Sequence, residues 1–123
     1  MPIPSMTILY VDNAEQSGAF YARLLDRQPV ETSPTFVLFV LDNGLKLGLW
    51  SKHTCIPAPD AGGGGAELAI AVASAAQVQA LFDAWTADGV SILQLPVTLD
   101  FGFTFLAADP DHHRVRVYAM AAD

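Results

Sequence analysis

The sequence predicts an α+β fold in which a βαβββ unit occurs twice and forms a curved sheet around a concave pocket. Two observations predict it: the chain repeats its own pattern, and each copy places one helical stretch among strand-like stretches. With 123 residues, the chain is long enough for one domain with a core and too short for two ordinary ones. We expect a single domain over residues 1–123, with repeat one at about 5–52, a linker at about 53–65 and repeat two at about 66–120.

The first half of each repeat combines a strand with a capped helix. Val11 aligns with Val72 at an offset of 61, which makes residues 6–11 and 67–72 equivalent strands. After each strand comes an N-cap residue with glutamine three positions later, a spacing typical of a helix start. These pairs are Asn13 with Gln16 and Ser74 with Gln77. Apolar residues then recur at helical spacing as far as residues 26–29 and 88–89, so each copy is expected to hold one helix.

The second halves align at an offset of 68. The stretch "NGLKLGLW" lies over "DHHRVRVY", so Gly48 falls on Arg116 and Trp50 on Tyr118. A strand-like run precedes each, "TFVLFVLD" in the first copy and "DFGFTFLAAD" in the second. Between the copies lies "APDAGGGGAE", whose four consecutive glycines indicate a flexible linker. No Lys-Ser/Thr follows these glycines, which argues against a phosphate-binding loop.

Side-chain alternation along the strands assigns each residue to one of two faces. One face packs on the helix and the other lines the concave side. The expected concave residues are Met6, Ile8, Tyr10, Lys46, Gly48, Trp50, Glu67, Ala69, Ala71, Arg114, Arg116 and Tyr118. The expected helix-facing residues are Thr7, Leu9, Val11, Leu68, Ile70, Val72, Val115 and Val117. The last strand alone therefore points two of only six basic residues, Arg114 and Arg116, into the concave side.

Charge and composition exclude several classes of partner. The net charge is −7, and such a surface repels nucleic acid and anionic membranes. No apolar run approaches the roughly 18 residues of a membrane span. Cys55 is the single cysteine, so an internal disulfide is excluded and a reducing compartment suits the chain. We expect a cytoplasmic protein with no nucleic-acid or membrane partner.

These patterns carry a resemblance to a known family. The opening "YVDNAEQSGAFYARLL" and the turn "FLAADPDHH", set in tandem βαβββ units, resemble the vicinal-oxygen-chelate superfamily of glyoxalase I, extradiol dioxygenases and bleomycin-resistance proteins. Within it, "LGLWS" and "DFGFTFLAADPDHHRVRV" look most similar to phenazine-resistance binding proteins, which sequester flat aromatic antibiotics. The resemblance implies a homodimer with shared or swapped halves. His112 stands where the family usually has glycine in this turn, and histidine tolerates left-handed backbone better than most residues.

The resemblance also carries over the four positions at which enzymes of this superfamily hold a divalent metal. They fall on Met6, Gly48, Glu67 and Arg116. Glutamate is a good oxygen ligand, but methionine is soft, glycine has no side chain, and arginine is a permanent cation. We therefore expect no metal and no other cofactor. Two roles for Arg116 stay open: an ion pair with Glu67, or a bidentate contact with an acidic group of a ligand.

Aromatic residues supply a candidate wall for a ligand. Alternation places Tyr10, Trp50 and Tyr118 on the concave face. Three phenylalanines alternate along one strand and are expected to share a face, which the sequence does not assign; they are Phe101, Phe103 and Phe105. The candidate ligand-binding residues are Trp50, Arg116, Tyr10, Tyr118, Phe101, Phe103, Glu67, Met6 and Gly48, and none is expected to be catalytic.

The favoured hypothesis is metal-free binding and sequestration of a planar aromatic small molecule, an antibiotic of phenazine type by resemblance. One alternative is a metal-dependent lyase or dioxygenase of the same superfamily. Another is a cofactorless enzyme in which Glu67 acts as general base, its pKa raised by burial. The expected partners are a planar aromatic compound and a second copy of the chain.

Overall fold

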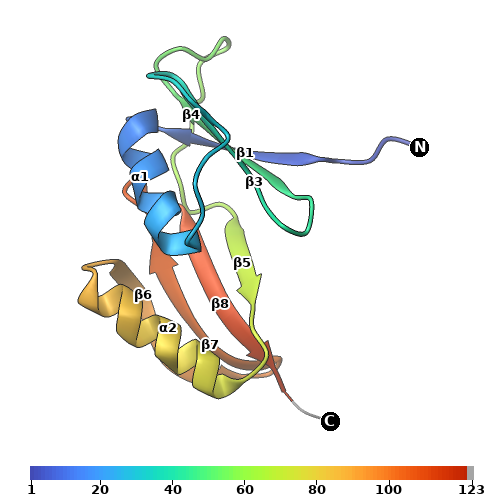
Figure 1. The fold of residues 1–123 in the computed structure, drawn as a ribbon, viewed down its shortest axis with the longest axis vertical. Coiled ribbons are helices and arrows are strands. Elements are labelled where there is room, and N and C mark those ends of the chain that lie inside the picture. Colours follow the sequence, from blue (N-terminus) through green and yellow to red (C-terminus); the bar gives the residue numbers. More distant parts are fainter. Residues whose placement is uncertain (122–123) are drawn as a thin grey trace. The chain divides into compact units, whose positions relative to one another are not determined.

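The computed structural model describes residues 1–121 and confirms the tandem βαβββ prediction. The chain divides into two compact units, Met1–Gly63 and Gly64–Asp123, each with one helix and one four-stranded sheet (Figure 1). Each unit is described here by itself. Within the described residues, neither helix has the length and apolar character that a membrane span requires.

Unit 1 contains a mixed four-stranded sheet and one helix. Its elements are β1 (Met6–Val11), α1 (Ala14–Leu25), β2 (Glu31–Thr32), β3 (Phe36–Val40) and β4 (Lys46–Ser51). The strand order is β1-β4-β3-β2, with β1 parallel to β4 and the other pairs antiparallel. A parallel pair needs a crossover, and α1 with β2 and β3 supplies it.

Unit 2 repeats this topology. Its elements are β5 (Glu67–Ala71), α2 (Ala75–Ala87), β6 (Ser91–Leu99), β7 (Gly102–Ala108) and β8 (Arg114–Met120). The order is β5-β8-β7-β6, with β5 parallel to β8 and the other pairs antiparallel. Ile8 pairs with Gly48 in unit 1, and Ala69 pairs with Arg116 in unit 2. The registers therefore reproduce both predicted offsets.

Both helices begin at the predicted caps. The Asn13 side chain accepts a hydrogen bond from the Gln16 backbone N–H at 2.9 Å, and Ser74 Oγ accepts one from the Gln77 N–H at 3.2 Å. Helix α1 is followed by the C-cap Asp26, which has left-handed backbone, and α2 by the C-cap Asp88 and then Gly89 at φ +81°. Each cap satisfies a backbone donor that the helix cannot, which explains the boundaries.

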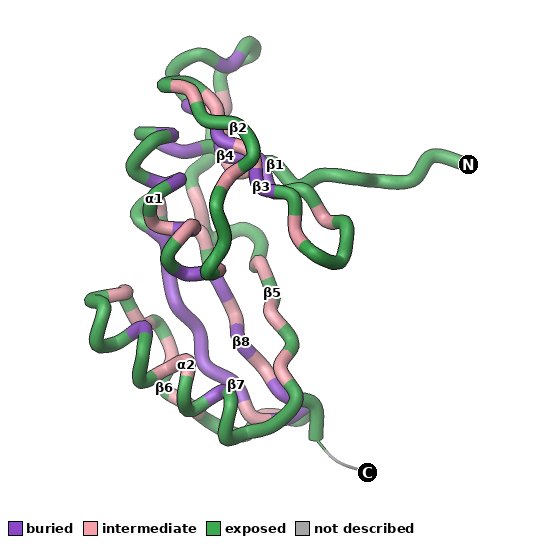
Figure 2. Tube along the Cα trace, in the orientation of Figure 1, coloured by how far each residue is buried: buried purple, intermediate pink, exposed green. Residues whose placement is uncertain are grey.

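Each unit has its own buried core, coloured purple in Figure 2. In unit 2, Phe105 is fully buried, with its ring centroid 5.4 Å from that of Phe82 and 5.3 Å from that of Trp85 on α2. The largest fully buried residues of unit 1 are Tyr21, Phe39, Leu47, Leu49, Val11 and Val37. Thr7 pairs with the fully buried Leu47 but is itself exposed near the start of β1, whereas Val11 at the other end of the strand is fully buried.

The "DPDHH" turn joins β7 to β8 and fixes where β8 starts. The buried Asp109 carboxylate accepts hydrogen bonds from the Asp111 N–H at 2.8 Å and the His113 N–H at 2.9 Å. His112 has φ +67°, so the left-handed backbone considered for this histidine is present. The turn thereby sets which residues of β8 face away from α2.

The prediction that Phe101, Phe103 and Phe105 share one face of a strand is wrong for Phe101. Strand β7 begins at Gly102, whose φ of +148° interrupts the alternation, and Phe101 precedes it in a turn. Phe105 packs on α2, and Phe103 shares its face by alternation, whereas Phe101 lies with Tyr118 on the opposite side of the sheet. The glycine is what separates Phe101 from the other two.

Gly102 should be the most sensitive glycine of unit 2. A Cβ there would lie 2.0 Å from the Ala119 carbonyl oxygen, and the φ of +148° is strained for any L side chain. We expect Gly102→Ala to lower the free energy of unfolding by about 2–4 kcal/mol in urea denaturation. Gly62→Ala, where a Cβ meets open space, is the control and should change it by less than about 0.5 kcal/mol. If the two substitutions lowered the free energy of unfolding equally, Gly102 would not be the most sensitive glycine of unit 2.

Candidate functional site

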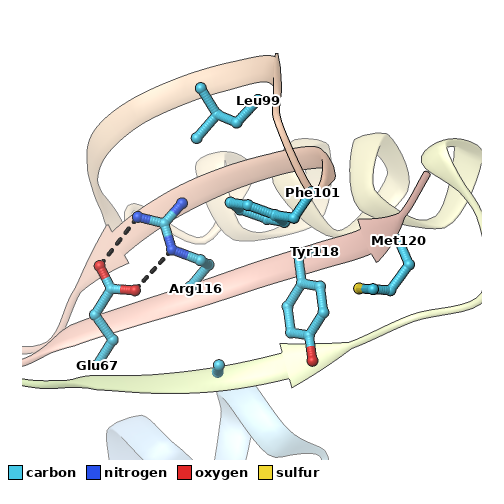
Figure 3. A pocket seen from close by; sticks show the side chains of 7 residues that line it. Glu67, Leu99, Phe101, Arg116, Tyr118 and Met120 are labelled. Atoms are coloured by element: carbon cyan, nitrogen blue, oxygen red, sulfur yellow. Dashed lines mark hydrogen bonds and ion pairs between the residues drawn. The ribbon is translucent and has the colours of Figure 1, made fainter.

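A hollow of about 450 Å³ lies on the face of the unit 2 sheet opposite the α2-packed side (Figure 3). It is lined by Glu67, Ala69, Leu99, Phe101, Arg116, Tyr118 and Met120. Strand alternation sends Arg116 and Tyr118 to this face, because Val115 and Val117 are buried in the core on the other. Most of the lining is apolar, with one ion pair at its Glu67 end.

Glu67 and Arg116 form a bidentate ion pair. Arg116 Nε donates to Glu67 Oε1 at 2.7 Å, and Nη2 donates to Oε2 at 3.0 Å. The pair is partly shielded from water, since the Arg116 side chain is 16% exposed and that of Glu67 is 31% exposed. Of the two roles left open for Arg116, the structure therefore contains the internal pair. Two parallel charge-assisted hydrogen bonds make this geometry strong and specific.

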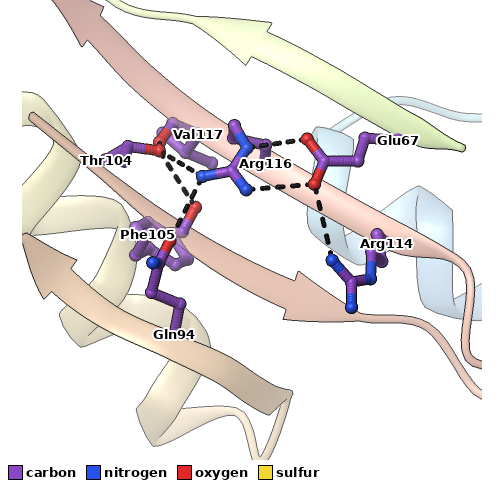
Figure 4. Close-up of polar contacts among 7 residues, drawn as sticks. All are labelled: Glu67, Gln94, Thr104, Phe105, Arg114, Arg116 and Val117. Atoms are coloured by element: carbon purple, nitrogen blue, oxygen red, sulfur yellow. Dashed lines mark hydrogen bonds and ion pairs between the residues drawn. The ribbon is translucent and has the colours of Figure 1, made fainter. Parts of the chain in front are cut away.

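The remaining donors of Arg116 are also engaged. Its Nη1 donates to Gln94 Oε1 and to Thr104 Oγ1, both at 3.2 Å (Figure 4). Thr104 is fully buried and donates in turn to the Val117 carbonyl oxygen at 2.8 Å. Four hydrogen bonds thus hold a guanidinium that has five N–H groups. The network spans β5, β6, β7 and β8, so Arg116 links all four strands.

The ion pair decides the protonation of both partners. The hydrogen bond from Arg116 lowers the pKa of Glu67 below its ordinary value of 4.5, and burial, which acts in the opposite direction, is the smaller effect. The same bond raises the pKa of Arg116. The hypothesis that Glu67 has a raised pKa is therefore wrong, because the hydrogen bond from Arg116 outweighs burial. A general base for neutral pH needs a pKa near the working pH, which a paired carboxylate of lowered pKa does not have.

The residues at the enzymes' metal positions do not fit a divalent metal. In unit 2 the Glu67 carboxylate is occupied by a guanidinium, a cation that does not lose its proton. In unit 1 the space beside Gly48 is filled, because a Cβ there would lie 2.9 Å from Phe36 Cζ and 3.4 Å from Met6 Sδ. Among residues 1–121, no three His, Cys, Asp or Glu side chains gather where they could hold a metal ion.

The aromatic candidates fall into two groups, one in each unit. In unit 2, the rings of Phe101 and Tyr118 meet edge to face with centroids 6.0 Å apart, in the wall of the hollow. In unit 1, Trp50 lies 6.5 Å from Tyr10 and 6.3 Å from Phe36, measured between ring centroids. The structure thus brings Glu67, Arg116, Phe101 and Tyr118 together, and separately Met6, Gly48, Tyr10 and Trp50. Phe103 joins neither group.

Sequence reasoning missed several residues of the site. The hollow also contains Leu99 and Met120, and the arginine network also contains Gln94 and Thr104. Met120 continues the alternation of Arg116 and Tyr118 along β8, so the sequence pattern could have placed it on the same face. The register of β6 against β7 shifts twice, between Ile92 and Gln94 and again before Val97. Counting by twos along β6 therefore fails to place its residues.

Comparison with known proteins decides the family. A profile described as "Glyoxalase/Bleomycin resistance protein/Dioxygenase superfamily" matches residues 3–117. The chain belongs to this superfamily. Solved members agree in fold: a glyoxalase-related enzyme from Fulvimarina pelagi has a TM-score of 0.85 at 22% identity, with 97% of this chain and 88% of that one covered.

Two relatives are nearer in sequence. The protein ATC0852 from Agrobacterium tumefaciens, solved by solution NMR, is 57% identical with a TM-score of 0.91, covering 99% of this chain and all of that one. The phenazine antibiotic resistance protein EhpR of Enterobacter agglomerans is 30% identical over 119 residues, 93% of this chain and 89% of its own length. The resemblance to phenazine-resistance proteins is thereby confirmed.

The contribution of the ion pair to stability can be measured by a double-mutant cycle. Removing one partner of a fully buried pair costs about 3–5 kcal/mol, and because Glu67 keeps 31% exposure we expect Arg116→Met to cost about 1–3 kcal/mol. Glu67→Gln in the Arg116→Met background should then cost less than it does in the wild type. Urea denaturation of the four proteins gives the coupling free energy.

The matched control is Arg27→Met. Arg27 pairs with Asp42 on the surface of unit 1, with side chains 41% and 82% exposed, and such pairs contribute about 0–1 kcal/mol. If Arg116→Met costs no more than Arg27→Met, the pair is not the structural element inferred here.

Proposed function

We propose that this chain binds and sequesters a planar aromatic small molecule of phenazine type, without a metal and without transforming it. The observation that carries the proposal is the guanidinium of Arg116 bonded to Glu67 beside an apolar-walled hollow. The similarity to the phenazine antibiotic resistance protein of Enterobacter agglomerans supports the ligand class. The same proposal places the protein in the cytoplasm, a compartment compatible with its single free cysteine, Cys55.

The hollow has the size and surface for such a ligand. Its volume of about 450 Å³ lies within the roughly 300–1,000 Å³ typical of small-molecule sites. Phe101 and Tyr118 offer ring surface, and Leu99 and Met120 offer flexible apolar contacts. Each aromatic pair adds about 0.5–1.5 kcal/mol beyond the burial of area, so affinity can arise without any chemical step.

The charged groups at the hollow favour binding over catalysis. A metal-dependent lyase or dioxygenase needs free ligands, and a cofactorless enzyme needs a base of raised pKa. The single carboxylate of the hollow is paired, and its pKa is lowered by Arg116. The site therefore offers shape, ring surface and fixed charge.

We propose further that the protein is a homodimer in which a second copy covers the hollow. The superfamily resemblance suggests pairing, and the rim residues Phe101 and Met120 are 37% and 70% exposed. Exposed apolar side chains next to an open hollow favour burial against another surface. The occupant we infer is the chain's own second copy.

Ligand binding is tested by calorimetric titration with phenazine. We expect saturable binding to the wild type, and affinities about 3- to 10-fold weaker for Phe101→Ala and for Tyr118→Ala, because each loses one aromatic contact. Val30→Ala, which shortens an exposed apolar side chain of unit 1, is the control and should bind as the wild type does.

Dialysis against EDTA before the titration should leave the affinity unchanged. Stoichiometric metal in the purified protein, or binding lost with the chelator, would favour the metal-dependent alternative. Conversion of phenazine during the titration would favour an enzyme.

The dimer is tested by light scattering coupled to size exclusion. We expect twice the chain mass of 13.1 kDa, and a shift to the single mass for Met120→Glu, which places a charge in the proposed interface. Val30→Glu adds the same charge at a residue of similar exposure, 65% against 70%, and should remain dimeric. A wild type of single mass contradicts the pairing.

A further inference from the structure

The concave face of unit 2 has a positive charge balance in an acidic protein. Among the strand residues that alternation places on this face, the charged ones are Glu67, Arg114 and Arg116, a formal balance of +1 on a chain of net charge −7. A local excess of one sign in a partly shielded recess attracts ligands of the other sign. The two arginines are not equivalent, however, and their contacts separate their roles.

Arg116 has no pair of free N–H donors with which to bind a ligand carboxylate bidentately. Its Nε and Nη2 point at the Glu67 carboxylate, and its Nη1 is shared between Gln94 and Thr104. An incoming carboxylate could take a bidentate position on Arg116 only by displacing Glu67. That exchange would leave Glu67 half-buried without its hydrogen bonds, which is costly.

Arg114 is differently placed. Its contact with Glu67 is long, 3.9 Å from Nη1 to Oε2, which is too far for a hydrogen bond, and its side chain is 45% exposed. Figure 4 shows this contact between Arg114 and Glu67. Its guanidinium fork can therefore take a second carboxylate without breaking any bond of the network.

Position connects Arg114 to the hollow. Arg114 does not line the hollow itself, but it pairs with Glu67, which does, across β8 and β5. Alternation places it on the same face as Arg116 and Tyr118. Tyr118 lies four positions further along β8, about 13 Å at roughly 3.3 Å per residue. A fused-ring molecule lying against Tyr118 and Phe101 can therefore extend an acidic substituent toward Arg114.

We propose that Arg114 binds an anionic substituent of the ligand, so that the preferred ligands are planar aromatic carboxylates, ahead of neutral or cationic rings. This inference rests on the proposed function, because it assigns one end of the same site. Arg116 is then the internal partner of Glu67, and Arg114 is the residue that determines ligand charge.

The test compares two probes of the same ring system, phenazine and phenazine-1-carboxylate, on the wild type and on Arg114→Gln. We expect the wild type to bind the carboxylate more tightly than phenazine. Arg114→Gln should lose about 10-fold in affinity for the carboxylate and less than about 2-fold for phenazine, because only the charge-assisted contact is removed. Higher salt should weaken carboxylate binding more than phenazine binding.

Arg23→Gln is the matched control, since it removes the same charge from an exposed position on α1 of unit 1. It should leave both affinities unchanged, which separates a local contact from the effect of net charge. Thermal melting of each variant checks that it is folded.

The outcomes distinguish this inference from the proposed function. If the wild type binds neither probe, the proposed function fails. If the wild type binds both probes but Arg114→Gln weakens both equally or neither, the role of Arg114 is overturned and the binding function stands. A carboxylate-specific loss in Arg116→Lys with none in Arg114→Gln would overturn it in favour of Arg116.

Discussion

The Glu67–Arg116 ion pair is the interaction on which the site of this superfamily member depends. Because arginine keeps its proton, Glu67 is held as a carboxylate with both oxygens occupied, and its pKa is lowered. The carboxylate is thereby occupied by the guanidinium instead of being free to bind a metal, and it is a weak base at neutral pH. Gln94 on β6 and Thr104 on β7 accept hydrogen bonds from the other side of the guanidinium, so two further strands also hold the pair in place.

The two repeats differ in how the space around equivalent positions is occupied, because only unit 2 contains this ion pair. Gly48 of unit 1 matches Arg116 of unit 2, and there the ring of Phe36 comes within 3 Å of where a Cβ would stand. An apolar neighbourhood at this position is filled by its own side chains, as close packing of apolar groups favours. In unit 2 the polar network spans the sheet, and the hollow of about 450 Å³ lies beside it. One topology therefore gives a filled position beside Gly48 in one copy and an open hollow beside Arg116 in the other.

The fold could be predicted because its signals are local and occur twice. The caps at Asn13 and Ser74 and the offsets of 61 and 68 come from neighbouring residues, and the register of β5 with β8 follows from them. The site could be predicted only where alternation is unbroken, as for Arg116 and Tyr118. At Phe101 a glycine of positive φ breaks the alternation, and along β6 two register shifts break it for Gln94. These irregularities depend on contacts between strands distant in the sequence.

An arginine beside an apolar binding surface raises a question of cost, because covering an unsatisfied cation with an aromatic ring would be unfavourable. In this site the protein's own hydrogen bonds to the guanidinium reduce the free-energy cost of covering it. Four hydrogen bonds to protein groups occupy the guanidinium, and the described residues contain no buried side-chain nitrogen or oxygen without a partner. A ligand that displaces water from Arg116 therefore leaves few donors unpaired, and the flat face of a guanidinium can itself stack on an aromatic ring. The same pairing that lowers the pKa of Glu67 thus reduces the free-energy cost of covering the charged end of the hollow with an apolar ring.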